Sequence, residues 1–281
     1  MTSGRTALTV VVLVAIGAAV LGASMKMPRA AKPLRVCADP NNLPYSNKQG
    51  EGFENHLASL VAGELGRPVS YTWWAQRRGF LRSTLKDSLC DVVMGVPSSI
   101  EMVRRTKPYY RSTYVFVSRR NRHLDLRSLD DTLLRHLRIG VPMVGDDYAS
   151  TPPAAAMIKR GLAKNLVSYS VYGDYSTANP PARIIDAVAN GDVDIAIAWG
   201  PLAGYFAKQS KTPLEITPVT PDNDGALRFA FDVSLGVRKK DHELRDQLDM
   251  FVTNHREEIN GILDGYNVPR VAPEAQLTRA K

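Results

Sequence analysis

The sequence lacks the motifs that mark most enzymes. Its 281 residues contain no G-x-S-x-G nucleophile elbow, no phosphate-binding G-x-x-x-x-G-K-[ST] and no dinucleotide-binding G-x-G-x-x-G. The five histidines are scattered, and none forms the H-E-x-x-H pair that holds a catalytic zinc ion. The acidic pairs at 146–147 and 222–224 lack the ligand spacing of a cation loop. We therefore expect no catalytic residues, no metal site and no cofactor, and an enzyme is the least supported class of function.

Cysteine is almost absent, with only Cys37 and Cys90 and no C-x-x-C motif. An even pair in an exported protein can form one disulfide bond, which is our expectation. Two buried free thiols are the alternative. One geometric concern remains: if the two strands that carry these residues are parallel neighbours in register, their Cα atoms would be too far apart to bridge.

Long hydrophobic runs are also lacking, except between residues 7 and 24. This run follows the single early charge of Arg5, ends in small residues at 23–24 and is followed by two more at 30–31. The pattern predicts a signal peptide or N-terminal anchor over residues 1–31, cleaved after Ala23 or later, and hence a periplasmic protein. An uncleaved anchor is the alternative and would be the only contact with a membrane. No Cys lies near this boundary, which argues against a lipid anchor.

The charge is moderately basic. Excluding Arg5, Lys26 and Arg29 as parts of the leader or its vicinity lowers the formal charge from +8 to +5. The arginine clusters are not interleaved with aromatic residues along a continuous stripe, so we expect no nucleic-acid partner. An acidic protein partner in the periplasm is compatible with this charge, because opposite charges accelerate encounter.

The remaining sequence alternates between short strands and helices. Strands are predicted at 34–38, 69–73 and 91–96, with helices at 53–65 and 80–88 between them. Such β-α-β-α-β order builds a parallel sheet flanked by helices. The fold class is therefore α/β.

A second cycle follows the first. A strand at 114–117 leads into it and a strand at 231–237 returns from it, so the chain crosses twice between two lobes, an arrangement that makes a hinge. We expect lobe 1 to comprise residues 32–118 and 235–281, and lobe 2 residues 119–234. Lobe 2 has further strands predicted at 137–141, 166–171 and 194–199, with helices at 154–163, 182–189 and from 200 to about 209. A final helix is predicted at 242–263, in lobe 1.

The segment 69–80 combines a strand with a loop rich in Trp, Gln and Arg. Trp73 is in phase with Val69 and Tyr71, which favours a place in the core. Trp74 and Arg77 follow at the strand end, where α/β proteins bind their ligands, and they are either a recognition surface or a solvated turn.

Three short motifs resemble those of type II periplasmic solute-binding proteins. Residues 52–57 resemble the family's G-F-[DE]-x-x-L helix start, 108–110 its P-Y-Y, and 191–196 its G-x-x-D-A-x strand entry. Longer stretches at 35–44, 71–80, 90–97 and 108–117 resemble the J-type accessory proteins of methanol dehydrogenase operons. This resemblance spans nearly all of residues 34–270. Ala75 departs from that family, which more often has Pro there.

The resemblance implies a two-lobe binding-protein fold with two hinge crossings and a non-enzymatic role. The implied partner is a PQQ-dependent methanol or alcohol dehydrogenase of calcium or lanthanide type, assisted in maturation or activation by a monomeric accessory protein. Amino-acid receptors of the wider family usually carry an Arg about nine residues before P-Y, whereas this chain has Pro97, Ser98, Ser99 and Ile100 in that region.

A transport-type receptor for a small polar or amino-acid-like solute is the alternative. For either role we expect one cleft, built from loops at strand ends. Its candidate residues are Asp39, Asn42, Tyr45, Trp74, Gln76, Arg77, Pro97, Ser98, Gly145, Asp174, Trp199 and Gly200.

Overall fold

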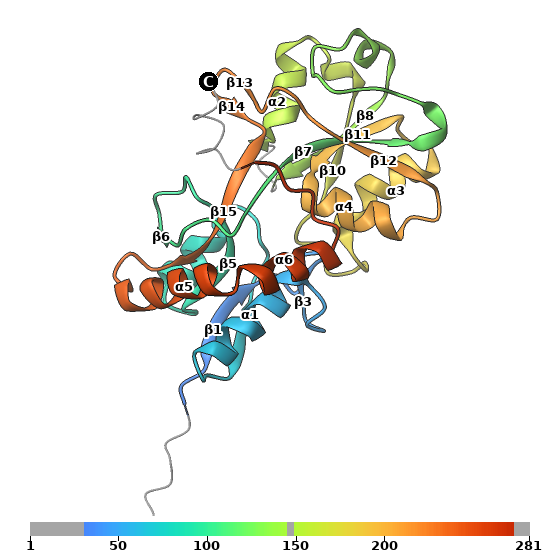
Figure 1. Cartoon of the computed structure of the whole chain (residues 1–281). Helices are drawn as coiled ribbons and strands as arrows, with labels where there is room; N and C mark the ends of the chain where they lie inside the picture. The colour runs from blue at the N-terminus through green and yellow to red at the C-terminus, as the bar shows by residue number, and fades with distance from the viewer. Residues whose placement is uncertain (1–30, 145–148, 273–281) are drawn as a thin grey trace, which may run out of the picture. The chain divides into compact units, whose positions relative to one another are not determined.

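A computed structural model describes residues 31–144 and 149–272 (Figure 1). The predicted leader, residues 1–31, lies outside these ranges except for Ala31. None of the helices in the described ranges is both long and apolar enough to cross a membrane.

The first predicted β-α-β-α-β unit is present. Its elements are β1 (Leu34–Ala38), β2 (Asn41–Asn42), β3 (Ser46–Asn47), α1 (Phe53–Glu64), β4 (Val69–Trp73), the π-helical turn η1 (Arg82–Lys86), β5 (Val92–Pro97) and β6 (Arg104–Arg105). The helix expected at 80–88 is present over residues 80–86, of which Arg82–Lys86 are π-helical.

The second unit follows the long strand β7. Its elements are β7 (Tyr110–Arg119), the 3-10 turns η2 (Arg120–Arg122) and η3 (Thr132–His136), β8 (Ile139–Val144), β9 (Ala149–Ser150), α2 (Pro152–Lys159), η4 (Ala163–Asn165), β10 (Leu166–Ser170), η5 (Pro180–Ala182), α3 (Arg183–Asn190), β11 (Ile195–Trp199), α4 (Gly200–Gln209) and β12 (Leu214–Pro218). The chain then returns through β13 (Asn223–Asp224), β14 (Leu227–Arg228), β15 (Ala230–Val237), α5 (His242–Asn254) and α6 (Arg256–Gly265).

The main strands of the described ranges form one hydrogen-bonded path in the order β10-β8-β11-β7-β15-β5-β1-β4. Strands β1, β4 and β5 pair in parallel, as do β8, β10 and β11. The long strands β7 and β15 are antiparallel to each other and to their outer neighbours. The parallel sheets predicted from the sequence are therefore joined by an antiparallel pair.

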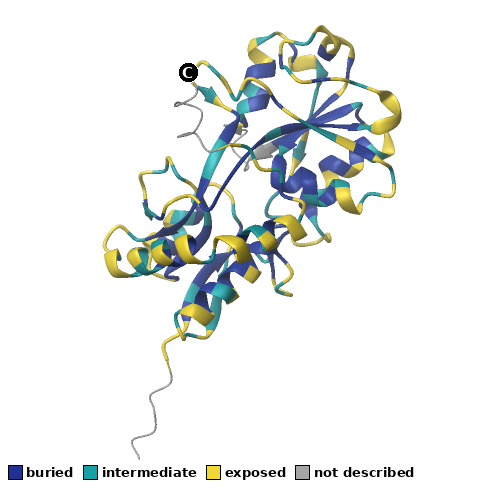
Figure 2. Cartoon of the chain, in the orientation of Figure 1, coloured by how far each residue is buried: buried dark blue, intermediate teal, exposed yellow. Residues whose placement is uncertain are grey.

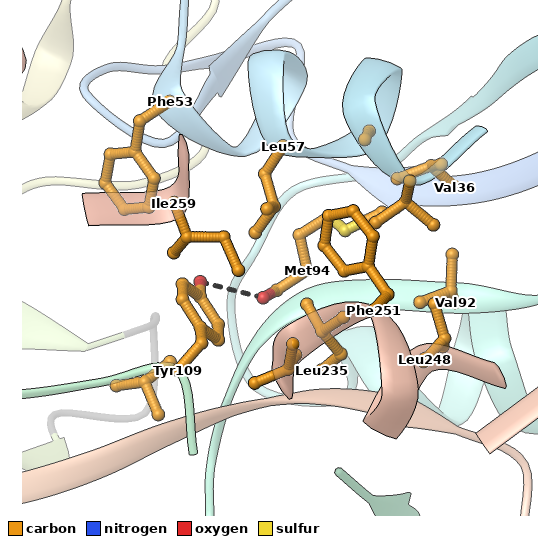
Figure 3. Packing of buried hydrophobic residues seen from close by; sticks show 14 of the residues in the cluster. Val36, Phe53, Leu57, Val92, Met94, Tyr109, Leu235, Leu248, Phe251 and Ile259 are labelled. Carbon is orange, nitrogen blue, oxygen red and sulfur yellow. Dashed lines mark hydrogen bonds between the residues drawn. The ribbon is translucent and has the colours of Figure 1, made fainter. Parts of the chain in front are cut away.

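The first core lies between helices α1, α5 and α6 and strands β1, β5 and β15 (Figure 3). Phe53 and Leu57 of α1 pack towards Met94 and Leu235 of the sheet, and all four are buried. The Tyr109 hydroxyl donates a hydrogen bond to the Met94 carbonyl at 2.9 Å. The amphipathic face predicted for α1 thus supplies one wall of this core.

Strand β11 separates two further cores. Ala196 and Ala198 face the cluster under α3 and α4, whereas Ile195 and Ile197 face the cluster under α2. A strand that is covered on both faces has a continuous run of apolar residues in its sequence, and residues 195–199 form such a run. Figure 2 shows the buried residues following these central strands.

The helix predicted at 242–263 is divided in two. The backbone of His255 leaves helical values, with φ −103° and ψ 31°, and its ring stacks on Phe251 at 4.8 Å between centroids. The apolar face continues across this break through Phe251 and Ile259, both buried, so the periodicity alone could not reveal it.

The predicted disulfide bond is present between Cys37 and Cys90, whose Cα atoms are 5.5 Å apart. Cys37 pairs in register with Val93, not with Cys90. Cys90 lies in the turn before β5, which brings it back towards β1. The concern about strand register was therefore misplaced.

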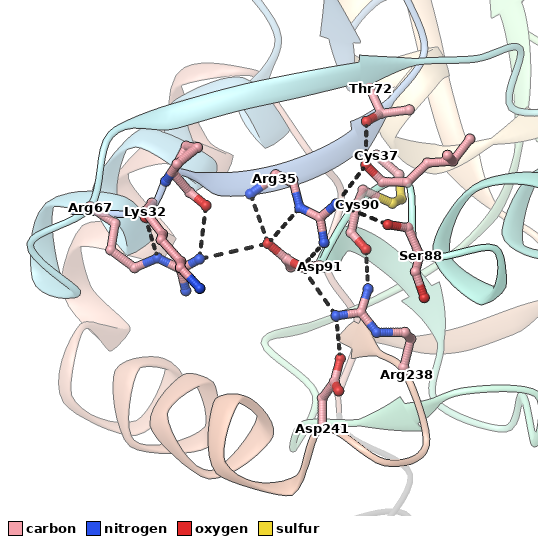
Figure 4. Close-up of polar contacts among 12 residues, drawn as sticks. Lys32, Arg35, Cys37, Arg67, Thr72, Ser88, Cys90, Asp91, Arg238 and Asp241 are labelled. Atoms are coloured by element: carbon pink, nitrogen blue, oxygen red, sulfur yellow. Dashed lines mark hydrogen bonds and ion pairs between the residues drawn. A yellow bond between two sulfur atoms is a disulfide. The ribbon is translucent and has the colours of Figure 1, made fainter. Parts of the chain in front are cut away.

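Next to the disulfide, the carboxylate of Asp91 lies close to three arginines (Figure 4). Asp91 lies 2.6 Å from Arg35, 3.1 Å from Arg238 and 3.6 Å from Arg67. Burial alone would raise the pKa of Asp91, but hydrogen bonds from Arg35 and Arg238 lower it below its usual value. The charged form is thus favoured in the folded chain, and this contribution to stability is lost as the pH falls below the usual range of a carboxyl group.

Removing the disulfide should destabilise the fold. Because the bond closes a sequence separation of 53 residues, the double change Cys37→Ser and Cys90→Ser should lower the free energy of unfolding by about 4 kcal/mol. Urea unfolding of the oxidised protein and of the double variant measures this. A reductant should lower the stability of the first and leave the second unchanged; equal stability of the two would contradict the prediction.

Asp91→Asn should lower the free energy of unfolding at neutral pH by about 2 kcal/mol, because it leaves three neighbouring guanidinium groups without their common carboxylate. Asp125 supplies the control, since its pair with Arg127 is exposed on both sides. Asp125→Asn should change stability by less than about 0.5 kcal/mol. A similar loss in both variants, measured by urea unfolding, would contradict the role given to Asp91.

Candidate functional site

Four adjoining strands carry the floor of a pocket of about 300 Å³. Their register brings the lining residues together: Trp199 of β11 pairs with Tyr114 of β7, Tyr110 of β7 with Val233 of β15, and Val233 with Pro97 of β5. Helix α1 and the loops around it supply other walls. The described residues that line the pocket are Asn42, Tyr45, Glu54, Gln76, Gly95, Val96, Pro97, Tyr110, Tyr114, Pro152, Tyr172, Trp199, Phe231 and Val233.

Six of these lining residues are aromatic. Trp199 lies at the centre of one group, with its ring 5.3 Å from Tyr114 and 5.8 Å from Phe231 between centroids, both edge to face. Tyr45 and Tyr110 form a second group, each packed against Phe53 at 5.4 and 6.3 Å. Such mutual ring contacts hold the side chains in fixed orientations, so the pocket has rigid apolar walls.

Glu54 is the one charged side chain among the described lining residues. It is only 5% exposed, and its backbone N–H donates to the Tyr45 carbonyl at 2.9 Å. The carboxyl group lies over the backbone of Gly95, where any side chain would collide with Oε1. Glycine at position 95 therefore leaves the space that Glu54 occupies.

Burial raises the pKa of Glu54 to about 8. The cause is desolvation alone, because none of the described residues donates a hydrogen bond or a positive charge to the carboxylate. A buried acid with no partner is costly to keep ionised, and carboxyl groups of this kind gather at functional sites.

A second, wider pocket of about 830 Å³ adjoins the segment at residues 73–80, the Trp-Trp loop. Trp73 and Trp74 line it together with Arg77 and Tyr175. Trp74 and Tyr175 are 45% and 51% exposed, which is unusual for large aromatic side chains. The expectation that Trp73 fills the core was wrong: β4 is the edge strand, and Trp73 is half-buried and stacked on Tyr71 at 4.5 Å.

The candidate cleft residues do not all line one pocket. The narrower pocket contains Asn42, Tyr45, Gln76, Pro97 and Trp199. The wider one contains Trp74 and Arg77. Gly145 lies outside the described residues.

The four other candidates line neither of these pockets and make local contacts. Asp39 is buried and accepts hydrogen bonds from the backbone of Gln76 at 2.7 Å and of Asn41 at 2.9 Å. The hydroxyl of Ser98 lies 2.6 Å from that of Ser234. Asp174 pairs with Arg183 at 2.6 Å, and Gly200 opens α4, where a side chain would lie 2.7 Å from Ser112 Oγ.

Sequence reasoning missed Glu54, Gly95 and four of the six rings. Glu54 is the acidic position of the G-F-[DE]-x-x-L helix start, and a carboxylate in a first helical turn is common because it favours the helix N-terminus. A signal was nevertheless present, because Glu54 precedes Ala58 and Val61 by four and seven residues, and both belong to the buried face of α1. An acid on an apolar helix face is buried, and a buried acid needs an explanation.

Comparison with known proteins gives the family. The model of the bacterial extracellular solute-binding proteins, family 3, matches residues 34–267. The chain belongs to this family. Protein MoxJ of Methylorubrum extorquens is 34% identical to this family 3 protein over 88% of the chain and 86% of the relative. Protein MoxJ of Paracoccus denitrificans is 29% identical over 90% and 94%.

Solved structures give the same result for the fold of this family 3 protein. MxaJ from Methlophaga aminisulfidivorans MPT superimposes with a TM-score of 0.73 at 26% identity, covering 85% of this chain and all of that one. The periplasmic binding protein XoxJ from Methylobacterium extorquens AM1 gives 0.69 at 33% identity, with the same coverage. The predicted type II periplasmic binding protein fold and the resemblance to J-type proteins are both confirmed.

The environment of Glu54 predicts an unusual pH dependence of stability. Because the carboxyl group ionises near 4.5 in the unfolded chain and at about 8 in the folded one, the folded chain binds more protons between these values. Its free energy of unfolding should therefore fall as the pH rises through this window. Glu54→Gln should remove the dependence and stabilise the chain at about pH 9 by on the order of 5 kcal/mol, with little change near pH 4.

Urea unfolding at three pH values measures this effect. Glu243 supplies the control, since it also lies in the first turn of a helix but is exposed. Glu243→Gln should keep the wild-type pH dependence. A Glu54→Gln variant with the same pH dependence as the wild type would show that this carboxyl group is not desolvated.

Proposed function

We propose that this chain is a periplasmic accessory factor of a PQQ-dependent methanol or alcohol dehydrogenase, which it binds and assists in maturation or activation. The observation that carries the proposal is its similarity to the MoxJ, MxaJ and XoxJ proteins over nearly the full length of both chains. In this proposal residues 32–118 with 235–281 and residues 119–234 act as two lobes, without catalysis and without a cofactor of their own.

The chemistry of the narrower pocket also supports an accessory role. A receptor for amino acids must compensate the charge of the α-carboxylate, normally with an arginine or another cation. None of the described residues that line this pocket is Arg, Lys or His. An amino acid placed there would lose the hydration of its carboxylate without gaining a positive partner.

The wider pocket offers a surface for a protein partner. Trp74 and Tyr175 expose large rings, and Arg77 and Lys48 lie beside them. Aromatic residues and arginine dominate the binding energy of many protein interfaces. We place the contact with the dehydrogenase on this face, which includes the Trp-Trp loop.

A transport-type solute receptor is the second candidate, favoured by membership of a solute-binding family and by a pocket of suitable size. Isothermal titration calorimetry against amino acids and organic acids distinguishes the two. A ligand with a dissociation constant below about 1 µM, roughly −8 kcal/mol, would favour transport.

Native mass spectrometry with the cognate dehydrogenase tests the proposal. The wild-type chain should form a complex, and Trp74→Ala should weaken it by about tenfold or more through loss of a central aromatic contact. Met250→Ala is the matched control, because Met250 is 59% exposed on α5 and does not line this pocket. Absence of any complex, together with unchanged maturation and activity of the dehydrogenase, would refute the accessory role.

A further inference from the structure

We propose that the pocket of about 300 Å³ binds a small organic cation, an ammonium group held between aromatic rings and the carboxylate of Glu54. The occupant we infer is a small amine or quaternary ammonium compound that carries no carboxylate. This inference does not depend on association with a dehydrogenase.

The rings provide the first argument. An ammonium group is attracted to the electron-rich faces of Trp, Tyr and Phe, and several rings around one space form an aromatic cage. Here Trp199, Tyr114 and Phe231 come from three neighbouring strands, and Tyr45, Tyr110 and Tyr172 complete the lining.

The unpaired acceptors provide the second argument. Glu54 is 95% buried, and no described residue supplies it with a donor or a positive charge. The side-chain oxygen of Asn42, in the same pocket wall, is also buried without a donor, while its amide nitrogen donates to Gln76 at 2.9 Å. A positive ligand compensates the carboxylate, and a primary amine can also donate hydrogen bonds.

The charge of the lining gives the third argument. With one acid and no base among the described lining residues, the pocket favours cations over anions and over zwitterions. A ligand with its own carboxylate would place that group against tyrosine rings or against Glu54. The structure therefore predicts selection for the amine and against the amino acid of similar size.

Binding should be coupled to the loss of a proton. Glu54 has a pKa of about 8 in the ligand-free chain, and ionised Glu54 is the form that attracts a cation. The titratable groups whose charge interacts with it are tyrosines with pKa values raised by burial, so they stay neutral below pH 9: Tyr45, Tyr71, Tyr109, Tyr110 and Tyr172. Affinity should thus rise about tenfold per pH unit up to about pH 8 and then level off.

The experiment compares two ligands of the same shape by isothermal titration calorimetry at about pH 8.5. Choline carries a positive charge, and 3,3-dimethylbutan-1-ol is its uncharged counterpart. Choline should bind the wild-type chain at least about tenfold more tightly than the alcohol. Glycine betaine, which adds a carboxylate to the same trimethylammonium group, should bind more weakly than choline. Butylammonium tests the primary amine.

Three variants locate the interaction. Glu54→Gln should reduce choline affinity by about tenfold or more and leave the alcohol unaffected. Trp199→Leu should reduce choline affinity while keeping an apolar side chain. Glu243→Gln should bind like the wild type. Loss of choline binding in Glu54→Gln cannot result from unfolding, because this variant is expected to be at least as stable; circular dichroism checks this.

The proposal is overturned if neither choline nor butylammonium binds, if choline and the alcohol bind equally, or if Glu54→Gln leaves choline affinity unchanged. It is also overturned if glycine betaine or an amino acid binds more tightly than choline, since that would require a cation in the pocket. Association with the dehydrogenase is measured separately, so either proposal can fail while the other stands.

Discussion

The antiparallel pairing of β7 with β15 is the constraint on which the rest of the structure depends. These two strands are the places where the chain leaves and re-enters its first sheet, and each continues into pairing with a different set of neighbours. Their register sets Tyr110 opposite Val233 and leaves Tyr114 to pair with Trp199. A slip of one residue would turn every one of these side chains to the opposite face. The pocket is therefore a consequence of strand register, and its loops only complete it.

The burial of Glu54 in the wall of the pocket lowers the stability of the fold. A glutamine or leucine at this position would pack against Gly95 without the cost of desolvating a charge. The position of this acid is fixed from two sides, because its backbone N–H is bonded to Tyr45 and because residue 95 has no side chain. Structural ion pairs elsewhere in the chain, such as Asp91 with its arginines, are compensated within the fold. The carboxyl group of Glu54 has no such compensation within the fold. Asp91 therefore stabilises the fold, whereas Glu54 is suited to bind a ligand.

Sequence patterns predicted most of the fold, because its central elements follow simple periods. The strands at 34–38, 69–73 and 195–199 and helix α1 were found within one or two residues. The two strands that were predicted incorrectly, β7 and β12, have local causes in the sequence. Strand β7 begins four residues earlier than predicted because Arg111, Ser112 and Thr113 read as polar, although all three are buried and Arg111 is paired with Asp222 and Asp232. Strand β12 went unnoticed because Glu215 and Thr217 alternate with only two apolar residues before Pro218.

The candidate site was harder to predict than the fold, for a physical reason. Residues at the ends of strands and in the loops beside them can be recognised locally, as Asn42, Tyr45, Gln76 and Trp199 were. Tyr110, Tyr114 and Phe231 lie within strands, and a strand residue faces either a core or a pocket according to what covers it in three dimensions. No local pattern distinguishes these two cases. The buried acid is the exception, since an ionisable group on an apolar helix face contradicts its surroundings in the sequence itself, and such contradictions point to a site from the amino-acid sequence alone.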